Sequence, residues 1–367
     1  MSREITIRTV ENKKDLMAFI KLPWKINRGD PNWVAPLIMD RLKFLNKEKN
    51  PFFKENPAEF FLAYRNGELV GRIAAILNHQ HNQYYNDKTG FFGCLEAIED
   101  QDVFDALLEK VKEWLRPKGC DLIMGPMNPS TNDEVGFLVD GFDTPPYFMM
   151  THNPPYYNNM MMAAGFEKAK DLLAFYLDKE HLVITEKVKR VTDGIKKKFP
   201  VTIRAVNIKK LNDELEVFRE IYNNAWSTNW GFVPLTPEEF DYVANDFKKI
   251  IDPELVLIAE LAGKPVGFCL ALPNYNEVFK KIPNGRLLPF GWLTFLLNKK
   301  KIKGIRVITL GAVKEYQHTG IGSLLYLEII RRGLAQGYDR AELSWVLEDN
   351  ELMIRPLQFL GAIPYKT

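Results

Sequence analysis

An internal repeat restricts the possible folds of this chain more than any other feature of its sequence. Residues 61–78 resemble residues 257–274 at a constant spacing of 196 positions. Six pairs are identical: Ala63/Ala259, Gly67/Gly263, Val70/Val266, Gly71/Gly267, Ala75/Ala271 and Asn78/Asn274. Each copy shows an apolar strand, a short turn and a second apolar strand, the pattern of a β-hairpin. In a chain of 367 residues this predicts two related domains, although coincidental hairpin chemistry would give the same pattern.

The order of predicted elements after the hairpin is the same in both copies. Each continues with a strand, an amphipathic helix, a second strand and a final helix. In the first copy these ranges are 91–97, 102–115, 121–125 and 155–164, and in the second they are 306–313, 322–336, 340–346 and 351–360. We therefore predict two copies of one α+β fold, a domain at 1–178 and a domain at 201–367. A charged linker at 179–200 joins them and contains a basic, helix-like run of its own. The first copy continues into a convincing strand at 170–177, whereas the second stops a few residues short of an equivalent.

Composition excludes several classes of protein. Hydrophobic residues make up 46% of the chain, too many for a disordered protein. The net charge of +2 argues against a dedicated nucleic-acid binder. Three scattered cysteines form neither a disulfide framework nor a zinc site, and the pair His79 and His81 lacks a third ligand, so we expect no metal. The chain opens without an apolar signal sequence and has no apolar run of about 18 residues, which leads us to expect a cytoplasmic protein.

A glycine-containing loop gives the sharpest chemical signal. The apolar strand 307–313 is followed by Lys314-Glu-Tyr-Gln-His-Thr-Gly-Ile-Gly-Ser323 and then by a strong helix pattern. Glycines let the backbone turn tightly, and a helix N-terminus presents unpaired N–H groups to an anion. The loop lacks the Lys-Ser/Thr of a Walker motif and the three glycines of a dinucleotide fingerprint. A pyrophosphate is the expected occupant.

Gln317-x-x-Gly320-x-Gly322 after a strand resembles the Gln/Arg-x-x-Gly-x-Gly/Ala signature of the GNAT superfamily of acyl-CoA N-acyltransferases. The resemblance covers the whole second copy and implies two GNAT-like domains, each a mixed, mostly antiparallel twisted sheet flanked by helices. It implies acetyl-CoA or another acyl-CoA as co-substrate. The implied coenzyme-binding residues are Gly311, Ala312, Val313, Gln317, His318, Thr319, Gly320, Ile321, Gly322, Ser323 and Asn350.

The first copy lacks the loop. At the corresponding place stands Ala97-Ile-Glu-Asp-Gln-Asp-Val103, without glycine and with three acidic side chains that would repel a pyrophosphate. The resemblance therefore implies a coenzyme site in the C-terminal copy only, with a degenerate N-terminal copy that shapes the acceptor pocket or stabilises the pair.

Catalytic residues are less readable. The tyrosine that often serves as general acid in this family stands four residues before the closing glycine, where this chain has Leu357. The remaining candidates are Glu348, Asp349, Glu342 and Tyr326. We prefer Glu348 as general base, because it follows a strand end, and we keep Tyr326 on the long helix as the second catalytic candidate. A capping role for Glu348 at the start of the last helix is the alternative.

An insertion in the second copy carries the apolar run Leu287–Leu297, followed by Asn298 and a lysine cluster up to Lys303. This segment could bury against the first copy, which we favour, fold over the acyl pocket, or contact a membrane through residues 287–303.

The leading hypothesis is an acyl-CoA-dependent N-acyltransferase, with acetyl as the expected acyl group and a small-molecule or peptide amine as acceptor. A non-catalytic acyl-CoA sensor and an aminoacyl-tRNA-dependent transferase of the tandem GNAT type are the alternatives. The charge balance speaks against a nucleic-acid partner. The protein could be a monomer or a homodimer, and the sequence leaves the acceptor open.

Overall fold

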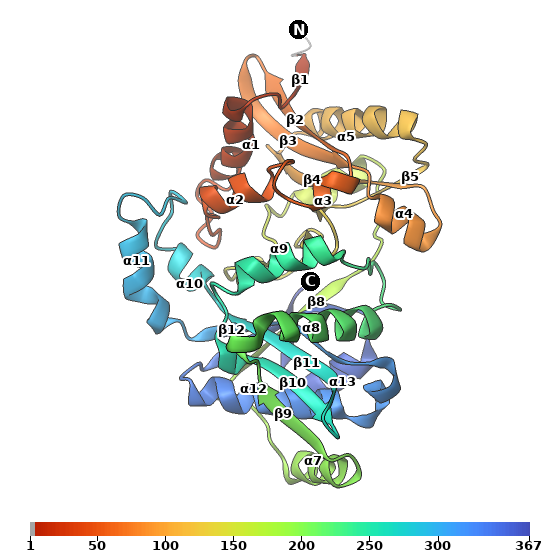
Figure 1. Cartoon of the computed structure of the whole chain (residues 1–367). Coiled ribbons are helices and arrows are strands. Elements are labelled where there is room, and N and C mark those ends of the chain that lie inside the picture. The colour runs from red at the N-terminus through yellow and green to blue at the C-terminus, as the bar shows by residue number, and fades with distance from the viewer. Residues whose placement is uncertain (1–3) are drawn as a thin grey trace. The chain divides into compact units, whose positions relative to one another are not determined.

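The computed structural model describes residues 4–367, which divide into two compact units (Figure 1). One unit contains the chain up to Ala169 together with Phe279–Leu296, and the other contains Lys170–Val278 and Leu297–Thr367. These units differ from the predicted domains in two places. The strand that closes the first copy belongs to the second unit, and the insertion of the second copy belongs largely to the first unit.

The first unit is built on a five-stranded sheet in the order β1-β2-β3-β4-β5, with β4 and β5 parallel and the other neighbours antiparallel. Its elements are β1 (Ile5–Thr9), α1 (Lys13–Ile26), α2 (Ile38–Phe44), α3 (Phe52–Glu55), β2 (Ala58–Arg65), β3 (Glu68–Ile76), α4 (His79–Tyr85), β4 (Thr89–Ala97), α5 (Gln101–Leu115), η1 (Arg116–Lys118), β5 (Leu122–Met124), β6 (Met127–Asn128), β7 (Glu134–Val135) and α6 (Tyr157–Ala163). Helix α5 packs on the sheet because Val103, Leu107 and Val111 recur on one helical face.

The second unit is built on a seven-stranded sheet in the order β14-β8-β13-β12-β11-β10-β9. Its elements are β8 (Leu172–Asp178), α7 (Glu186–Lys198), β9 (Val201–Ala205), η2 (Ile208–Lys210), α8 (Leu211–Ala225), α9 (Pro237–Phe247), η3 (Pro253–Leu255), β10 (Val256–Leu261), β11 (Lys264–Pro273), η4 (Lys299–Lys301), β12 (Gly304–Ala312), η5 (Lys314–Thr319), α12 (Ile321–Ala335), β13 (Arg340–Leu347), α13 (Glu351–Phe359) and β14 (Ile363–Lys366). Two further helices, α10 (Asn276–Phe279) and α11 (Gly291–Asn298), each have residues assigned to both units.

The alternation of strand β10 shows how this sheet is covered on both faces. Leu257 and Ala259 belong to the core under α12, whereas Val256 and Ile258 belong to the core under α8. Figure 1 shows α8 and α12 against the sheet formed by β10, β11 and β12.

The two predicted hairpins are present and share their irregularities. The turns Asn66-Gly67 and Ala262-Gly263 both have two consecutive positive φ angles, as a two-residue hairpin turn requires. A register shift follows Ala63 in β2 and Ala259 in β10, again at the repeat spacing. The mixed, mostly antiparallel sheets with flanking helices confirm the predicted fold class.

Strand β8 fills the gap left at the end of the second copy. It pairs antiparallel with β13 from Arg340↔Asp178 to Leu347↔Leu172 and with β14 on its other side. The strand predicted to close the first copy therefore lies in the sheet of the second unit, between that sheet's last two strands. Figure 1 shows it there, in yellow-green beside the blue end of the chain.

The apolar run that we expected to be buried is largely exposed. Leu288 is 74% exposed and Phe290 is 75% exposed, and Trp292, Leu293, Leu296 and Leu297 of α11 are exposed as well. Within residues 4–367, no helix combines the length and apolar character needed to cross a membrane.

Candidate functional site: the splayed strands and the phosphate loop

Strands β12 and β13 pair over only part of their length. Their parallel pairing runs from Gly304↔Arg340 to Val307↔Leu343, although β12 continues to Ala312 and β13 to Leu347. At the same point β12 carries a bulge, since Thr309 faces Leu270 and Val307 faces Ala271, which leaves Ile308 as the extra residue. The two strands therefore diverge just beyond Val307.

Hydrogen-bond alternation shows which amides face this opening. The amide of Val313 donates to the carbonyl of Val266 at 2.9 Å, so this pair is hydrogen-bonded across β11. Antiparallel pairs alternate, which directs Gly311 toward β11 as well and turns the N–H groups of Leu310 and Ala312 toward the side of β13. Of the predicted residues Gly311, Ala312 and Val313, only Ala312 thus presents its amide to the opening.

The predicted phosphate loop lies directly after β12. Residues Lys314–Thr319 form a tight 3₁₀ turn, and Gly320 with φ +87° begins helix α12. The amides of Ser323 and Leu324 donate to the Gly320 carbonyl, while the first amides of a helix precede any intrahelical acceptor. Between Tyr316 and Ser323 the loop has no acidic side chain. Backbone donors at a helix start, without a competing carboxylate, fit a pyrophosphate.

The end of helix α8 holds this loop in place. The side-chain oxygen of Asn224 accepts from the amide of Lys314 at 2.8 Å, and the Gln317 amide nitrogen donates to the carbonyl of Ala225 at 2.9 Å. A β-carbon on Gly311 would lie 2.9 Å from the Trp226 ring, so the indole packs directly on that glycine. Sequence reasoning missed Asn224 and Trp226, because nothing local to them indicates contact with a loop about ninety residues later.

The linker helix α7 covers the glycine of the loop. A β-carbon on Gly320 would lie 2.5 Å from Cδ1 of Ile195. The last turn of α7 carries Lys196, Lys197 and Lys198. The predicted basic run of the linker is therefore a helix that adds an apolar contact to the loop and cationic side chains to the same part of the unit.

The other predicted loop residues take different positions. Ile321 is buried in the core, His318 is exposed, and the Thr319 hydroxyl donates to the carbonyl of Tyr316 at 2.6 Å. A β-carbon on Gly322 would make an ordinary van der Waals contact with a Leu310 methyl at 3.7 Å. Residues 317–323 thus form one continuous segment, from the end of the 3₁₀ turn to the first residues of α12. Their side chains point to different surroundings, so a ligand at this segment would be held by backbone amides.

The corresponding helix start in the first unit is occupied by its own carboxylate. Asp100 caps α5 through the amide of Val103 and also forms an ion pair with Arg65. The Arg65 hydrogen bond holds the pKa of Asp100 below its usual range. A carboxylate at this helix start would repel a pyrophosphate; the absence of a coenzyme site in this copy stays a prediction.

A buried polar network lies where β12 and β13 begin to diverge. Glu342 is 0% exposed and Arg306 is 2% exposed. Arg306 Nε donates to Ser344 Oγ at 2.9 Å, and the Ser344 hydroxyl donates to Glu342 Oε1 at 2.7 Å. The Tyr365 hydroxyl donates to the other oxygen of Glu342. Because Leu343 faces α12, the strand alternation places this network on the opposite face of the sheet.

Burial raises the pKa of Glu342, an effect that Arg306, Tyr365 and Ser344 oppose. A carboxyl group with a raised pKa is a better proton acceptor than an ordinary glutamate. Two residues beyond the last paired residue of β12, the buried Thr309 hydroxyl has no hydrogen-bond partner among residues 4–367. The sheet at this opening therefore combines a buried carboxyl group of raised pKa with a buried hydroxyl that has no hydrogen-bond partner among residues 4–367.

The structure places Glu348 at the surface end of β13. Its carboxylate accepts from the amide of Asp171 at 3.1 Å, and its amide donates to the Asp171 carbonyl at 3.2 Å. This reciprocal pair joins β13 to the start of β8, a structural role. The neighbouring Asn350 begins α13 without a side-chain cap.

Tyr326 lies in the core rather than at the opening. The residue is buried, its hydroxyl contacts Met353 Sδ at 3.9 Å, and burial raises its pKa well above the usual range. The placement favours packing over the predicted catalytic role. We expect Tyr326→Phe to keep the initial rate of acyl transfer within about 2-fold and to change stability by about 1 kcal/mol or less. Initial rates and thermal unfolding test this, and a drop of an order of magnitude in kcat with an unchanged Tm would restore the catalytic role.

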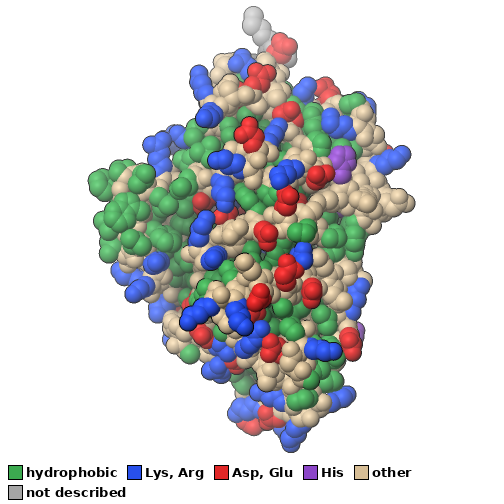
Figure 2. Space-filling view, in the orientation of Figure 1, with side chains coloured by type: hydrophobic (Ala, Val, Ile, Leu, Met, Phe, Trp, Pro, Cys, Tyr) green, Lys and Arg blue, Asp and Glu red, His purple; other side chains and the backbone are tan. Residues whose placement is uncertain are grey.

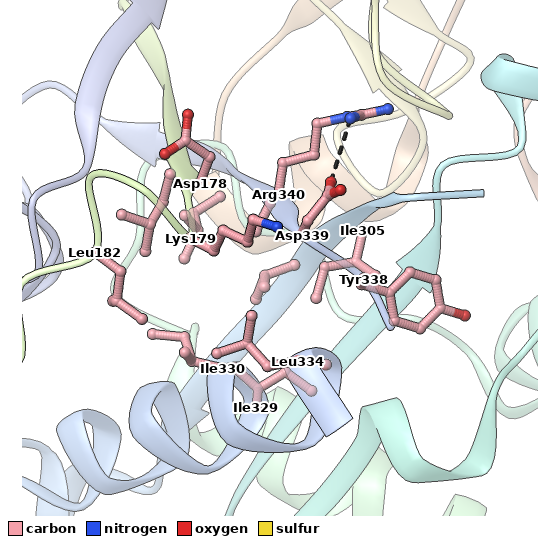
Figure 3. Close-up of a pocket in the computed structure, with 15 residues that line it drawn as sticks. Asp178, Lys179, Leu182, Ile305, Ile329, Ile330, Leu334, Tyr338, Asp339 and Arg340 are labelled. Atoms are coloured by element: carbon pink, nitrogen blue, oxygen red, sulfur yellow. Dashed lines mark hydrogen bonds and ion pairs between the residues drawn. The ribbon is translucent and has the colours of Figure 1, made fainter. Parts of the chain in front are cut away.

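One apolar crevice lies elsewhere on the same helix. Its walls come from the second half of α12, including Ile329, Ile330 and Leu334, from the first residues of β12 and β13, and from the end of β8 and the residues that follow it (Figure 3). Asp339 and Arg340 form an ion pair at its rim. Its volume of about 40 Å³ is far below the several hundred Å³ of a ligand pocket. The crevice lies at the opposite end of α12 from the loop and is too small for an acyl chain.

Within the described residues, no three His, Cys, Asp or Glu side chains gather in a way that could hold a metal ion. His81, singled out in the sequence, packs edge-on against Phe91 and lies 3.4 Å from Asp87. Burial lowers its pKa. The histidine therefore belongs to the packing around α4.

Splayed parallel strands followed by a glycine-containing turn are the arrangement that the sequence resemblance led us to expect. A model of the acetyltransferase (GNAT) family matches residues 215–361, and the chain belongs to this family as an acyltransferase with two GNAT-like domains.

Two relatives match from end to end. The chain is 39% identical over 98% of its length to the protein YghO of Escherichia coli, covering 93% of that protein. It is 36% identical over 99% of its length to a bacterial ceramide synthase of Caulobacter vibrioides, covering 96% of it. Among solved structures, a tandem GNAT protein from the clavulanic acid biosynthesis pathway aligns over 99% of this chain and 96% of its own with a TM-score of 0.57. Its 12% identity makes this a likeness of fold.

Proposed function

We propose that this protein transfers a fatty acyl group from acyl-CoA to the primary amine of a long-chain amino alcohol. The observation that carries the proposal is the 36% identity, across nearly the whole chain, to a protein named bacterial ceramide synthase. A ceramide is the amide of a fatty acid and a long-chain amino alcohol, so its synthesis is an N-acyl transfer. Acetyl-CoA, the acyl donor that the family resemblance suggested, is the competing donor.

Acyl-CoA supplies the activated acyl group. The backbone of residues 317–323 would hold its pyrophosphate, with the N-terminal dipole of α12 in support. The amides of Leu310 and Ala312, turned toward the opening between β12 and β13, would donate to the thioester carbonyl and stabilise the negative charge that develops on its oxygen. In the reaction the amine nitrogen forms a bond to the acyl carbon, the carbon–sulfur bond breaks, and coenzyme A leaves as a thiolate. The amine gives up one proton, which finally protonates the released thiolate.

Glu342 is the group that we assign to this proton. The raised pKa of its buried carboxyl group suits proton acceptance, and Ser344, to which it is hydrogen-bonded, lies at the first position of β13 beyond the paired segment. Ser344 could therefore pass a proton from the opening to Glu342, with Arg306 and Tyr365 stabilising the carboxylate. The carboxylate of Glu348, preferred from the sequence, instead accepts a hydrogen bond from the backbone amide of Asp171, just before β8.

The test compares donors and acceptors in one assay. Purified protein is incubated with acetyl-CoA or palmitoyl-CoA, each with sphinganine or with a short water-soluble amino alcohol, and amide formation is followed by mass spectrometry. We expect palmitoyl-CoA with sphinganine to give a kcat/KM at least about 10-fold above acetyl-CoA, since each buried methylene contributes about 0.8 kcal/mol. A preference for acetyl-CoA would reject the proposal. Coenzyme binding without any product would support the sensor alternative, and turnover only with charged tRNA would support the aminoacyl alternative.

A further inference from the structure

One end of the insertion in the second copy carries a group of large, exposed apolar side chains. The insertion tip, defined as Leu288, Phe290, Trp292, Leu293, Leu296 and Leu297, is exposed at every position. Figure 2 shows it as a continuous hydrophobic projection at the left of the molecule, over α11 in Figure 1. Single exposed apolar side chains are common on proteins, whereas a contiguous set of large ones marks a contact surface.

The tip stands on a well-fixed base. The Trp24 indole donates to the carbonyl of Pro283 at 2.8 Å, and the amide of Ile38 donates to the carbonyl of Gly285 at 2.9 Å. Gly285 takes φ +64°, and a β-carbon there would lie 2.4 Å from the Pro36 carbonyl oxygen. Because residues 283–285 are fixed by these contacts, the exposed tip projects from an ordered segment.

The inner and outer sides of α11 differ. Phe295 stacks on Phe279 with ring centroids 6.1 Å apart, which fixes one side of the helix. The indole nitrogen of Trp292 donates to the carbonyl of Pro289 at 2.8 Å, so this exposed tryptophan needs no polar partner from outside. The outward side of the tip can therefore enter an apolar medium without leaving its indole donor unpaired.

Positive charge borders the tip on both sides in the chain. Lys299, Lys300 and Lys301 follow α11 directly and are exposed, and Lys280 and Arg286 precede it and are exposed. No acidic residue lies between Lys280 and Lys303. Apolar side chains next to exposed lysines match the boundary between acyl chains and anionic headgroups.

We propose that the insertion tip docks this protein on the surface of an anionic lipid bilayer. Helix α11 has eight residues and is about 12 Å long, well short of the roughly 30 Å apolar core of a bilayer. The tip therefore inserts into one leaflet while the lysines contact headgroup phosphates. The docking is independent of acyl transfer and would also hold for a protein with another acceptor.

Vesicle co-sedimentation of the full-length protein tests the proposal. The probes are large vesicles of phosphatidylcholine alone and of an equal mixture of phosphatidylcholine and phosphatidylglycerol. We expect binding to the mixed vesicles that the double variant Leu288→Ser/Phe290→Ser loses. The triple variant Lys299→Glu/Lys300→Glu/Lys301→Glu should lower partition at least about 10-fold. All changed side chains are exposed, and thermal unfolding verifies that each variant is folded.

The matched control is Leu352→Ser/Phe359→Ser, which removes an exposed leucine and an exposed phenylalanine from α13. We expect it to bind vesicles like the unchanged protein. Absence of vesicle binding by the unchanged protein, or equal loss in the control, would overturn the proposal. A lipid-free dimer that dissociates in the Leu288→Ser/Phe290→Ser variant, without vesicle binding, would show that a second copy of the chain covers the tip instead. The assay contains no acyl donor, so its failure leaves the proposed reaction untouched.

Discussion

Replacing Gly320 with glutamate should weaken acyl-CoA binding at least about 100-fold. Gly320 has φ +87°, and a side chain there would meet Ile195 of α7 at once. The left-handed conformation alone costs a residue with a β-carbon about 1–2 kcal/mol. A carboxylate at the start of α12 would also oppose the anion that the loop is expected to hold, at a cost of a few kcal/mol at short range. Isothermal titration with acyl-CoA measures the loss.

The control for this variant is Gly337→Glu. Gly337 also has a positive φ, at +89°, and follows the opposite end of the same helix, where the nearest atom to a built β-carbon is Lys303 Nζ at 4.0 Å. Both variants introduce the same charge and the same backbone strain, but only one changes the loop. If the Gly320→Glu variant binds acyl-CoA with unchanged affinity, or if both variants lose affinity equally, the loop does not bind the coenzyme.

Glu342→Gln should lower kcat/KM by about 100-fold or more, the contribution typical of a general base. The unchanged protein should lose activity as the pH falls, because Glu342 must be deprotonated to accept a proton and burial raises its pKa above that of an ordinary glutamate. In the variant this acidic limb of the pH profile should be absent, while acyl-CoA binding should persist.

Two further variants distinguish catalysis from structure. Tyr365→Phe removes a hydrogen bond that lowers the pKa of Glu342, so the acidic limb should move to higher pH while activity at alkaline pH is largely kept. Glu348→Gln makes the same chemical change at an exposed carboxylate and should alter kcat by about 2-fold or less. If Glu348→Gln loses most of its kcat and Glu342→Gln keeps the kcat of the unchanged protein, Glu348 is the general base. Because Glu342→Gln leaves buried Arg306 short of a partner, its Tm must be measured alongside.

Local signals in the sequence predicted most of the elements correctly. The two hairpin turns, the helices α5 and α12 and the start of the phosphate loop each depend on residues close together in the chain, such as Asn66-Gly67 or Gly320. The fold class followed from these elements and their repetition. The helix in the linker was also visible from its own composition.

Features that depend on distant pairing could not be predicted. Which amides of β12 face the opening depends on the register against β11, and a shift of one residue would exchange Gly311 for Ala312. The contacts of Asn224 and Trp226 depend on where α8 ends in space. Glu342 was among the candidates, but only its burial and its partners Ser344 and Tyr365 distinguish it from Glu348. Whether the apolar run Leu287–Leu297 is buried or exposed depends on which other residues pack against it. Hydropathy does not contain this information.

The position of β8 has a consequence for synthesis on the ribosome. Leu172–Asp178 emerges from the ribosome long before its neighbours β13 and β14 are translated. During that interval its apolar residues and both of its edges lack the partners they have in the finished sheet, which is the condition under which nascent chains associate wrongly. The second unit therefore completes its sheet only after residues 340–366 have been made, and in the cell the nascent chain should depend on chaperones that bind exposed apolar segments.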